Sequence, residues 1–272
     1  MRIRGVDLHD TDNVMHSGDI ADFARKNGLL DSVDEHSFDS ATAFGYYWEA
    51  GHPENKNYNT DRLWLAQKML TPSLAQPVRQ ISYPLFLQPD VPVSVESVKR
   101  VLRGTYRGTE LEGIADRPIG VVRTAESHIM SIDCRLPKNL RGIIWQAVST
   151  PLGTPYLPVF GIQEDYPSCY AIGGSNYDEE SAYWAFRSLF TLAASSGEDI
   201  YESVWRDYEA YVNVKFAALH AELADKDTPK KEKVSSAMKF SYKILEDAVR
   251  KAKAERTLRI TRMASAQKDG QA

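Results

Sequence analysis

Cysteine is scarce in this sequence, since only Cys134 and Cys169 occur among its 272 residues. Two cysteines cannot form a disulfide framework, and their spacing does not match a Cys-x-x-Cys metal site. The scarcity fits a reducing compartment, so the sequence predicts a cytoplasmic location. We expect both residues to be buried free thiols with a packing role.

Long hydrophobic runs and an excess of charge of one sign are also absent. No stretch approaches the length of a membrane span, and residues 1–20 lack the apolar centre of a signal peptide. The formal net charge is −4 and the isoelectric point is about 5.9. These values argue against general binding to nucleic acid or to a membrane surface, so we expect neither as a partner.

A phosphate-binding loop and a calcium-binding loop are missing too. Gly173-Gly174 is followed neither by a lysine nor by the helix spacing of a phosphate loop. Residues 7–13 are rich in oxygen ligands, but the glycine and the distal glutamate of a calcium loop are absent. A solvated loop is the interpretation that we prefer for this segment.

Residues 118–163 carry most of the β-strand signal in the chain. Apolar, β-rich runs occupy residues 119–122, 129–132, 142–148 and 156–162. Pro137, Asn139 and Gly142 suit a hairpin connection between the second and third of these runs. The nearly continuous apolar run at 142–148 is typical of a strand covered on both faces. We therefore predict a central antiparallel sheet.

A cluster of polar residues interrupts this β-rich stretch at Arg123, Thr124, Glu126, Ser127 and His128. Such side chains are costly inside a sheet unless they pair or take part in function. The planar fork of Arg123 suits a carboxylate, and Glu126 suits either that arginine or an α-amino group. A structural ion pair between the two is the alternative, and the residues alone leave both interpretations open.

Ser127, His128 and Asp133 together invite comparison with a serine-hydrolase triad. Neighbouring residues of a strand point to opposite faces, so we expect Ser127 and His128 to point apart. We therefore disfavour a self-contained serine hydrolase. A histidine held by structural partners is the plainer interpretation of His128 taken alone.

Helix signals dominate the rest of the chain. Helices are expected over residues 17–28, 39–48, 59–70, 94–104, 178–194, 198–224 and from 228 to about 260. The first is predicted to bury Ile20 and Phe23. Asp178-Glu-Glu is predicted to form the first turn of the fifth, where the helix dipole favours acidic side chains.

The order of these elements predicts an α+β chain. We expect residues 1–175 to hold the sheet, residues 176–262 to form a helical section packed on it, and residues 263–272 to be a disordered tail. The lysines between residues 230 and 253 are expected to form a solvated helix face.

Three motifs, Arg123-Thr-Ala-Glu-Ser-His-Ile, Ile143-Ile-Trp and Ser181-Ala-Tyr-Trp-Ala-Phe-Arg, occur in this order. Their order and spacing resemble the bacterial dipeptidase A family, which are cysteine dipeptidases of the N-terminal nucleophile hydrolase class. The resemblance extends from residue 1 to about residue 225. It implies part of the antiparallel αββα sandwich of that class, with a helical C-terminal section. It also implies hydrolysis of dipeptides through a cysteine acyl-enzyme.

The resemblance further implies that the nucleophile lies outside this chain. The family's nucleophilic cysteine is the mature N-terminal residue, because its own α-amine acts as the base. A segment similar to Met1-Arg-Ile-Arg-Gly-Val-Asp-Leu lies in mid-chain in that family. Neither Cys134 nor Cys169 can be N-terminal, so we expect the C-terminal part of such an enzyme, inactive alone. The asparagine of the oxyanion hole is expected to be missing as well.

By the same resemblance, Arg123, Glu126, Ser127 and His128 are expected to bind the substrate. Arg123 would match an arginine that lies beside the nucleophile in related hydrolases. No metal or organic cofactor is implied. The expected partners are a dipeptide, the missing N-terminal half and a second copy of the chain. The alternative is a non-catalytic product, either a truncated remnant or a docking subunit for a separate nucleophile-bearing half.

Overall fold

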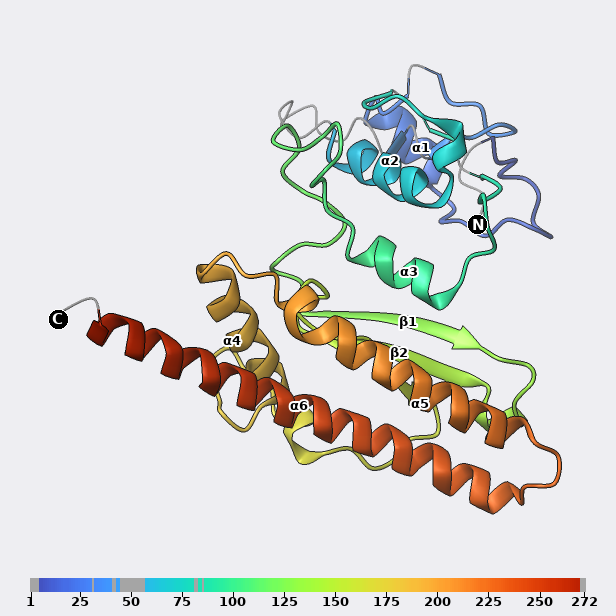
Figure 1. The fold of residues 1–272 in the computed structure, drawn as a ribbon. Coiled ribbons are helices and arrows are strands. Elements are labelled where there is room, and N and C mark those ends of the chain that lie inside the picture. Colours follow the sequence, from blue (N-terminus) through green and yellow to red (C-terminus); the bar gives the residue numbers. More distant parts are fainter. Residues whose placement is uncertain are drawn as a thin grey trace. The chain divides into compact units, whose positions relative to one another are not determined.

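The computed structural model describes residues 5–30, 32–40, 43–44, 57–80, 83–84 and 86–269. The chain divides into two compact units, one of residues 1–91 and 106–118 and the other of residues 92–105 and 119–272. The described residues form an α+β structure, with six α-helices and one three-stranded antiparallel sheet (Figure 1). The sheet and the helices that follow it belong to the second unit.

The first unit contains helices α1 (Ile20–Lys26) and α2 (Tyr58–Leu70). The buried side of α1 consists of Ala21 and Ala24, whereas Phe23 is 52% exposed, so the prediction that Phe23 is inward is wrong. Two alanines pack closely against Phe38 and Leu8 and leave no room on that side for a larger ring.

Near the N-terminus, the described residues form an isolated antiparallel bridge between Val6 and Phe38. Residues 1–4 lie outside the described part, as does most of the helix predicted at 39–48. Helix α2 follows its prediction in extent. Its buried side is built around Trp64, whose indole N–H donates to the carbonyl of Gln76 at 2.8 Å.

The sheet of the second unit consists of β1 (Glu126–Ile132), β2 (Gly142–Val148) and β3 (Leu157–Phe160), in that order. Both pairs are antiparallel, and the register places Glu126 opposite Val148 and Ile132 opposite Gly142. The hairpin and the strand at 142–148 are confirmed. The strand predicted at 119–122 is wrong, because these residues form a bend and a turn.

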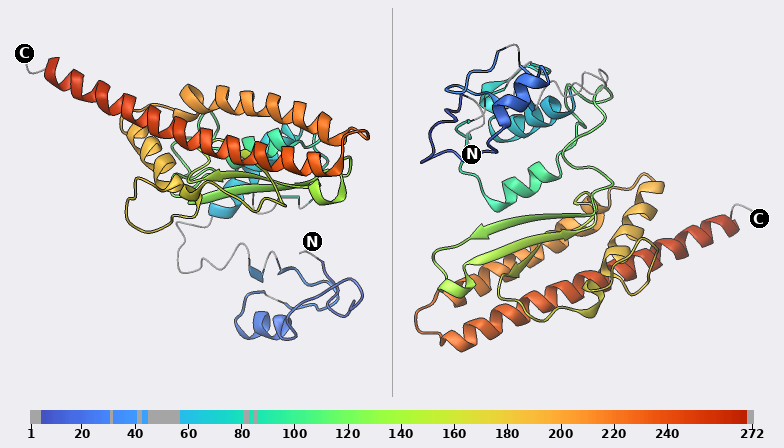
Figure 2. Two further views of the ribbon diagram at one scale, coloured as in Figure 1. Left: turned by 90° about the horizontal axis from the view of Figure 1, so that it is seen from below. Right: turned by 180° about the vertical axis from the view of Figure 1, so that it is seen from behind.

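Only one face of β2 is fully covered, which corrects the expectation of a strand buried on both faces. Ile143, Trp145 and Ala147 are buried, while Ile144, Gln146 and Val148 are only partly buried. The covered face packs against α5 (Arg206–Ala224), where the rings of Trp145 and Phe216 meet edge to face with centroids 4.9 Å apart. Figures 1 and 2 show α5 lying across this face.

Three more helices complete the second unit. Helix α3 (Val95–Leu102) is capped by Ser94 as predicted, with a reciprocal bond from Ser97. Helix α4 spans Ala182–Ser195, and a short π-helical turn at Tyr201–Trp205 leads into α5. Helix α6 spans Lys230–Asp269 and runs antiparallel beside α5 (Figures 1 and 2).

Two predicted helix ends are wrong. Helix α4 is capped by Ser181, whose hydroxyl accepts from the N–H of Trp184, so Asp178-Glu-Glu precedes the helix instead of forming its first turn. Helix α6 continues to Asp269, beyond the predicted end near residue 260, and so includes residues 263–269 of the expected disordered tail.

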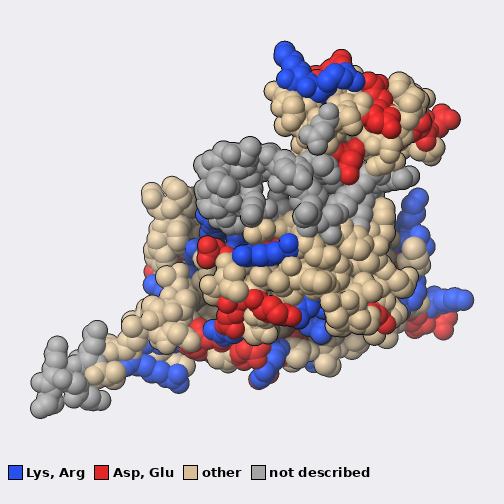
Figure 3. Space-filling view, turned by 90° about the horizontal axis from the view of Figure 1, so that it is seen from above, with Lys and Arg blue, Asp and Glu red and all other residues tan. Residues whose placement is uncertain are grey.

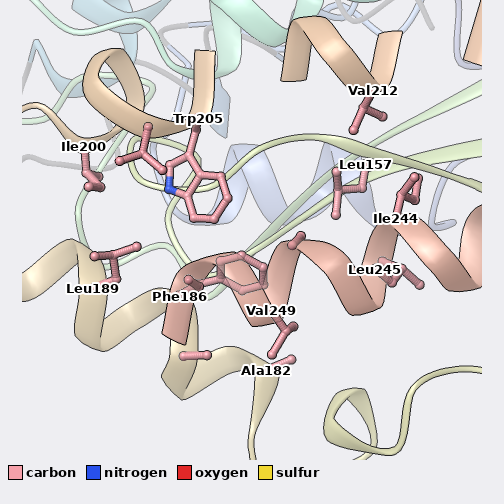
Figure 4. Packing of buried hydrophobic residues seen from close by; sticks show 14 of the residues in the cluster. Leu157, Ala182, Phe186, Leu189, Ile200, Trp205, Val212, Ile244, Leu245 and Val249 are labelled. Carbon is pink, nitrogen blue, oxygen red and sulfur yellow. The ribbon is translucent and has the colours of Figure 1, made fainter. Parts of the chain in front are cut away.

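The largest hydrophobic cluster joins α4, α6 and the turn before α5. Figure 4 shows the indole of Trp205 at its centre, facing Phe186 of α4. The two rings have centroids 5.6 Å apart. Leu245 and Val249 of α6 close the cluster from the other side. This packing joins the helices of the second unit to the sheet.

The surface matches the modest net charge. On the face shown in Figure 3, acidic and basic side chains are interspersed instead of gathered into one broad area of a single sign. None of the helices that the structure describes combines the length and the apolar composition needed to cross a bilayer.

Candidate functional site

The predicted substrate-binding residues lie together at the start of β1. Arg123 is exposed in the turn Val121–Thr124, which the N–H of Thr124 closes by donating to the carbonyl of Val121 at 3.2 Å. Glu126 and His128 follow on one face of β1. The imidazole Nδ1 lies 3.0 and 3.1 Å from the two carboxylate oxygens. A guanidinium and a carboxylate–imidazole pair are thus exposed at one end of an edge strand.

The alternative interpretation, an ion pair between Arg123 and Glu126, is not found among the described residues. Glu126 joins His128 instead, because residues two apart in a strand lie on the same face. The guanidinium of Arg123 remains exposed to solvent. It is therefore able to meet a carboxylate from outside the chain.

Ser127 points to the other face of β1, as predicted from the alternation of a strand. Its hydroxyl shares a hydrogen bond of 2.7 Å with the hydroxyl of Tyr156, which is fully buried. Burial raises the pKa of Tyr156, so the phenol stays neutral at physiological pH. Ser127 is therefore bound to the interior and not to His128.

Asp133 lies at the far end of β1 and has different partners. Its carboxylate binds Arg135 and, at 2.8 Å, the Nε2 of His220 from α5. The Arg135 guanidinium holds the pKa of Asp133 well below its usual range. Ser127, His128 and Asp133 each have a separate partner, so the structure does not assemble them into a triad.

A buried cluster of charges lies behind Ser127, and sequence reasoning missed it. Glu209 of α5 is only 2% exposed. Its carboxylate lies 2.7 Å from the guanidinium of Arg103 and 3.5 Å from the ammonium group of Lys99. The backbone N–H of Tyr156 donates to the same carboxylate at 2.8 Å. The cluster therefore ties α3, α5 and the start of β3 together, directly beneath the tyrosine that binds Ser127.

Arg103 also organises the loop between β2 and β3. Its guanidinium donates to the carbonyls of Pro151 and Thr154 at 2.8 and 2.9 Å. It stacks between the rings of Tyr156 and Tyr201, 4.7 and 3.9 Å from their centroids. Lys99 and Arg103 stand four residues apart, which puts them on one helix face, and this spacing was the available signal. The valines and the leucine of α3 gave a stronger apolar signal than this pair of cations.

Ser149, which follows the end of β2, is another residue that sequence reasoning missed, and no sequence signal marks it. It is fully buried, and its backbone adopts a left-handed φ of 76°. Its N–H donates to the carbonyl of Ala125, beside the start of β1. Its hydroxyl has no hydrogen-bond partner among the described residues. Backbone strain of about 1–3 kcal/mol in a non-glycine residue is typical of functional regions, so Ser149 is a candidate site residue.

The cysteines do not form a nucleophilic centre. Both are free, but Cys134 is exposed in the hairpin, so the expectation that both are buried is wrong. Cys169 is partly buried, and this burial raises the pKa of its thiol and disfavours the thiolate.

Metal ligands do not gather within the described ranges, where no group of three or more His, Cys, Asp or Glu side chains is placed to hold an ion. In the acidic segment at 7–13, Asp7 accepts from the N–H of His9 and Asp10 accepts from Asn13. These local bonds are those of a turn, as preferred from the sequence.

Comparison with known proteins shows the family of this chain. A sequence model described as peptidase family C69 matches residues 1–213, which include the whole sheet and the polar cluster on β1. The match ends within α5, so α6 follows it.

Three curated relatives illustrate the similarity. A probable dipeptidase of Latilactobacillus sakei is 29% identical over 202 residues, covering 71% of this chain and 41% of that protein. A probable dipeptidase of Salmonella dublin is 34% identical over 170 residues, covering 58% and 37%. A probable dipeptidase A of Streptococcus pyogenes serotype M3 is 26% identical over 227 residues, covering 80% and 47%. The chain spans roughly two fifths to one half of the length of these relatives.

Proposed function

Because this chain belongs to peptidase family C69, we propose that it forms part of a cysteine dipeptidase and supplies a wall of the substrate site. The nucleophile comes from a segment outside residues 1–272. Two observations support this division. Neither Cys134 nor Cys169 is an N-terminal residue, and the chain spans roughly two fifths to one half of the length of its relatives.

The cluster at the start of β1 carries the proposal. A dipeptide has a carboxylate at one end and an ammonium group at the other. The exposed fork of Arg123 suits the carboxylate, and the carboxylate of Glu126, held by His128, suits the ammonium group. Ser127 steadies this end of the strand from the opposite face through Tyr156.

The proposed reaction passes through a thioester. The cysteine sulfur attacks the amide carbon and its proton moves to the cysteine's own α-amine. The C–N bond then breaks, and that amine protonates the departing amino acid. Water hydrolyses the thioester, releases the second amino acid and restores the thiol. Arg123 holds the carboxylate of the departing amino acid throughout the first half.

The exposed apolar side chains on the sheet face turned away from α5 favour the presence of a partner segment there. Met130 and Ile132 of β1 are 74% and 79% exposed, and Met130 pairs with the partly buried Ile144 of β2. Figure 2 shows this face, turned away from α5, in the view from behind. We assign it to the second sheet of an αββα sandwich, which would cover these side chains and complete the hydrolase fold.

Replacement of Arg123 tests the substrate role. The chain is co-expressed with the N-terminal half of the Latilactobacillus sakei relative, and dipeptide turnover is measured. Arg123→Lys should lower kcat/KM by a factor that corresponds to a loss of about 2–4 kcal/mol of transition-state stabilisation, since a point charge cannot reproduce the bidentate contact. Arg135→Lys, in the hairpin at the far end of β1, is the matched control and should leave kcat/KM unchanged. Equal rates for both variants would reduce Arg123 to a structural residue.

The complementation experiment also distinguishes the proposed dipeptidase from the alternative, a non-catalytic chain. If the assembled pair binds but never turns over a dipeptide, the chain is a docking subunit or a remnant without catalytic function. If no complex forms, the assignment of the uncovered sheet face fails.

A further inference from the structure

A groove of about 980 Å³ lies between α5 and α6, and none of the residues assigned to the dipeptide lines it. Tyr208 and Tyr211 of α5 form one wall, and Met238 and Phe240 of α6 form the other. The hydroxyl of Tyr208 donates to the carbonyl of Ile244 at 3.1 Å and thereby joins the two helices at one end. A volume of this size and an apolar lining suit a small organic ligand.

The charge around the groove is positive although the chain is acidic overall. Its lining includes four lysines, at positions 215, 231, 239 and 243, against Asp165 and Asp247. The chain as a whole carries a net charge of −4. The rim therefore favours an anion.

Two of these lysines are already engaged. Lys243 binds Asp247 at 2.9 Å, and Lys215 lies 5.6 Å from the centroid of the Tyr211 ring. Lys231 and Lys239 are exposed and take part in none of the ion pairs found among the described residues. They are the cations that a bound anion would meet.

One residue that lines the groove, Gln163, carries a buried acceptor. Gln163 is 9% exposed, and its amide group donates to the carbonyl of Asp165. Its Oε1 is buried without a hydrogen-bond partner among the described residues, a state that costs about 1–3 kcal/mol. The terminal torsion of glutamine is soft, so a small rotation turns this oxygen towards a ligand N–H.

We propose that the groove between α5 and α6 binds a small carboxylate with an aromatic or aliphatic body and an amide N–H, the chemistry of an N-acylated hydrophobic amino acid. The body lies between the tyrosines of α5 and Met238 and Phe240 of α6. The carboxylate meets Lys231 and Lys239, and the amide N–H donates to Gln163. Such a ligand satisfies the apolar walls, the positive rim and the orphaned acceptor together.

Calorimetric titration of the whole chain with N-acetyl-L-tryptophan tests the proposal, with the uncharged N-acetyl-L-tryptophanamide as the matched ligand. We expect one saturable site for the carboxylate and a dissociation constant at least about fivefold higher for the amide, which is about 1 kcal/mol. Lys231→Glu with Lys239→Glu should remove this difference between the ligands. Lys226→Glu, an exposed lysine outside the groove, should preserve it.

Three further variants locate the ligand. Gln163→Leu should weaken both ligands, because both carry the amide N–H, and Met238→Trp should block both by filling the groove. Arg123→Ala should change neither, so failure of the dipeptide proposal leaves this one standing. Absence of saturable binding, equal affinity of the two ligands, or loss of binding in Arg123→Ala would overturn the proposal. So would a dimer in light scattering that Met238→Trp dissociates, since a second copy would then occupy the groove.

Discussion

Glu209 shows how much one buried carboxylate holds together in this chain. It neutralises Arg103, approaches Lys99 and accepts the N–H of Tyr156, so three elements depend on a single side chain. Glu209 and Lys99 are both buried, so the loss of these bonds would leave polar groups unpaired in the interior. The same side chain therefore supports the loop and the tyrosine behind Ser127.

Neutralising Glu209 should be costly. Glu209→Gln removes the carboxylate that pairs with Arg103 and leaves Lys99 with Glu96, and we expect the free energy of unfolding to fall by about 3 kcal/mol. The control is Glu202→Gln, whose carboxylate pairs with Arg206 on the surface and should matter by less than about 1 kcal/mol. Urea denaturation measures both. A loss at position 209 no larger than at position 202 would contradict the assigned role of the cluster.

At the scale of elements, the sequence predicts those features that have a local cause. The strand at 142–148 follows from a nearly continuous apolar run, and the start of α3 follows from the capping chemistry of Ser94. The burial of Lys99 was not predictable, because its ammonium group lies 2.7 Å from Glu96 of its own helix and 3.5 Å from Glu209 of α5, which is more than one hundred residues away. The run at 119–122 is apolar but pairs with no strand among the described residues, so its apolar character alone led to a wrong strand prediction.

The C-terminal part of α6 is held by a carboxylate that lies before α5. Arg259 binds Glu198 at 2.5 and 2.8 Å and also binds Glu255 of its own helix. The guanidinium of Arg259 lowers the pKa of Glu198 to about 2, from an ordinary value of 4.5. Because the folded state favours the carboxylate, its stabilisation is complete above pH 4.5 and is lost as the pH falls towards 2.

This linkage predicts the pH dependence of stability. Between about pH 5 and about pH 3, the free energy of unfolding should fall less in Glu198→Gln than in the unmodified chain, since the variant has no proton to take up. Glu246→Gln, an exposed position on α6, should retain the full dependence. Parallel pH profiles for the unmodified chain and Glu198→Gln would show that Glu198 contributes nothing.

At the scale of the whole molecule, the prominent feature is the exposure of two apolar side chains, Met130 and Ile132, on one face of β1. β1 is also an edge strand, and such edges favour association with other chains. Arg123 and the three candidate residues of β1 stand out by their polarity within a β-rich stretch, and their substrate role stays a prediction. Their pairing was not predictable, since Tyr156 and the strand register bring together residues that composition cannot connect.

The chain alone should therefore self-associate. Met130→Thr with Ile132→Thr is expected to shift size-exclusion profiles with light scattering towards the monomer of 30.6 kDa. Val214→Thr, an equally exposed apolar position on α5, should not. A sharp monomer for the unmodified chain would mean that this face needs no partner.

The most direct test of the account is dipeptide turnover with the two cysteines replaced. The chain alone should show none. The chain complemented by the N-terminal half of a relative should turn over dipeptides, and should do so equally well with both Cys134→Ala and Cys169→Ala present. Turnover by the chain alone that either substitution abolishes would contradict the account. Turnover by the chain alone that survives both would point instead to Ser127 and His128.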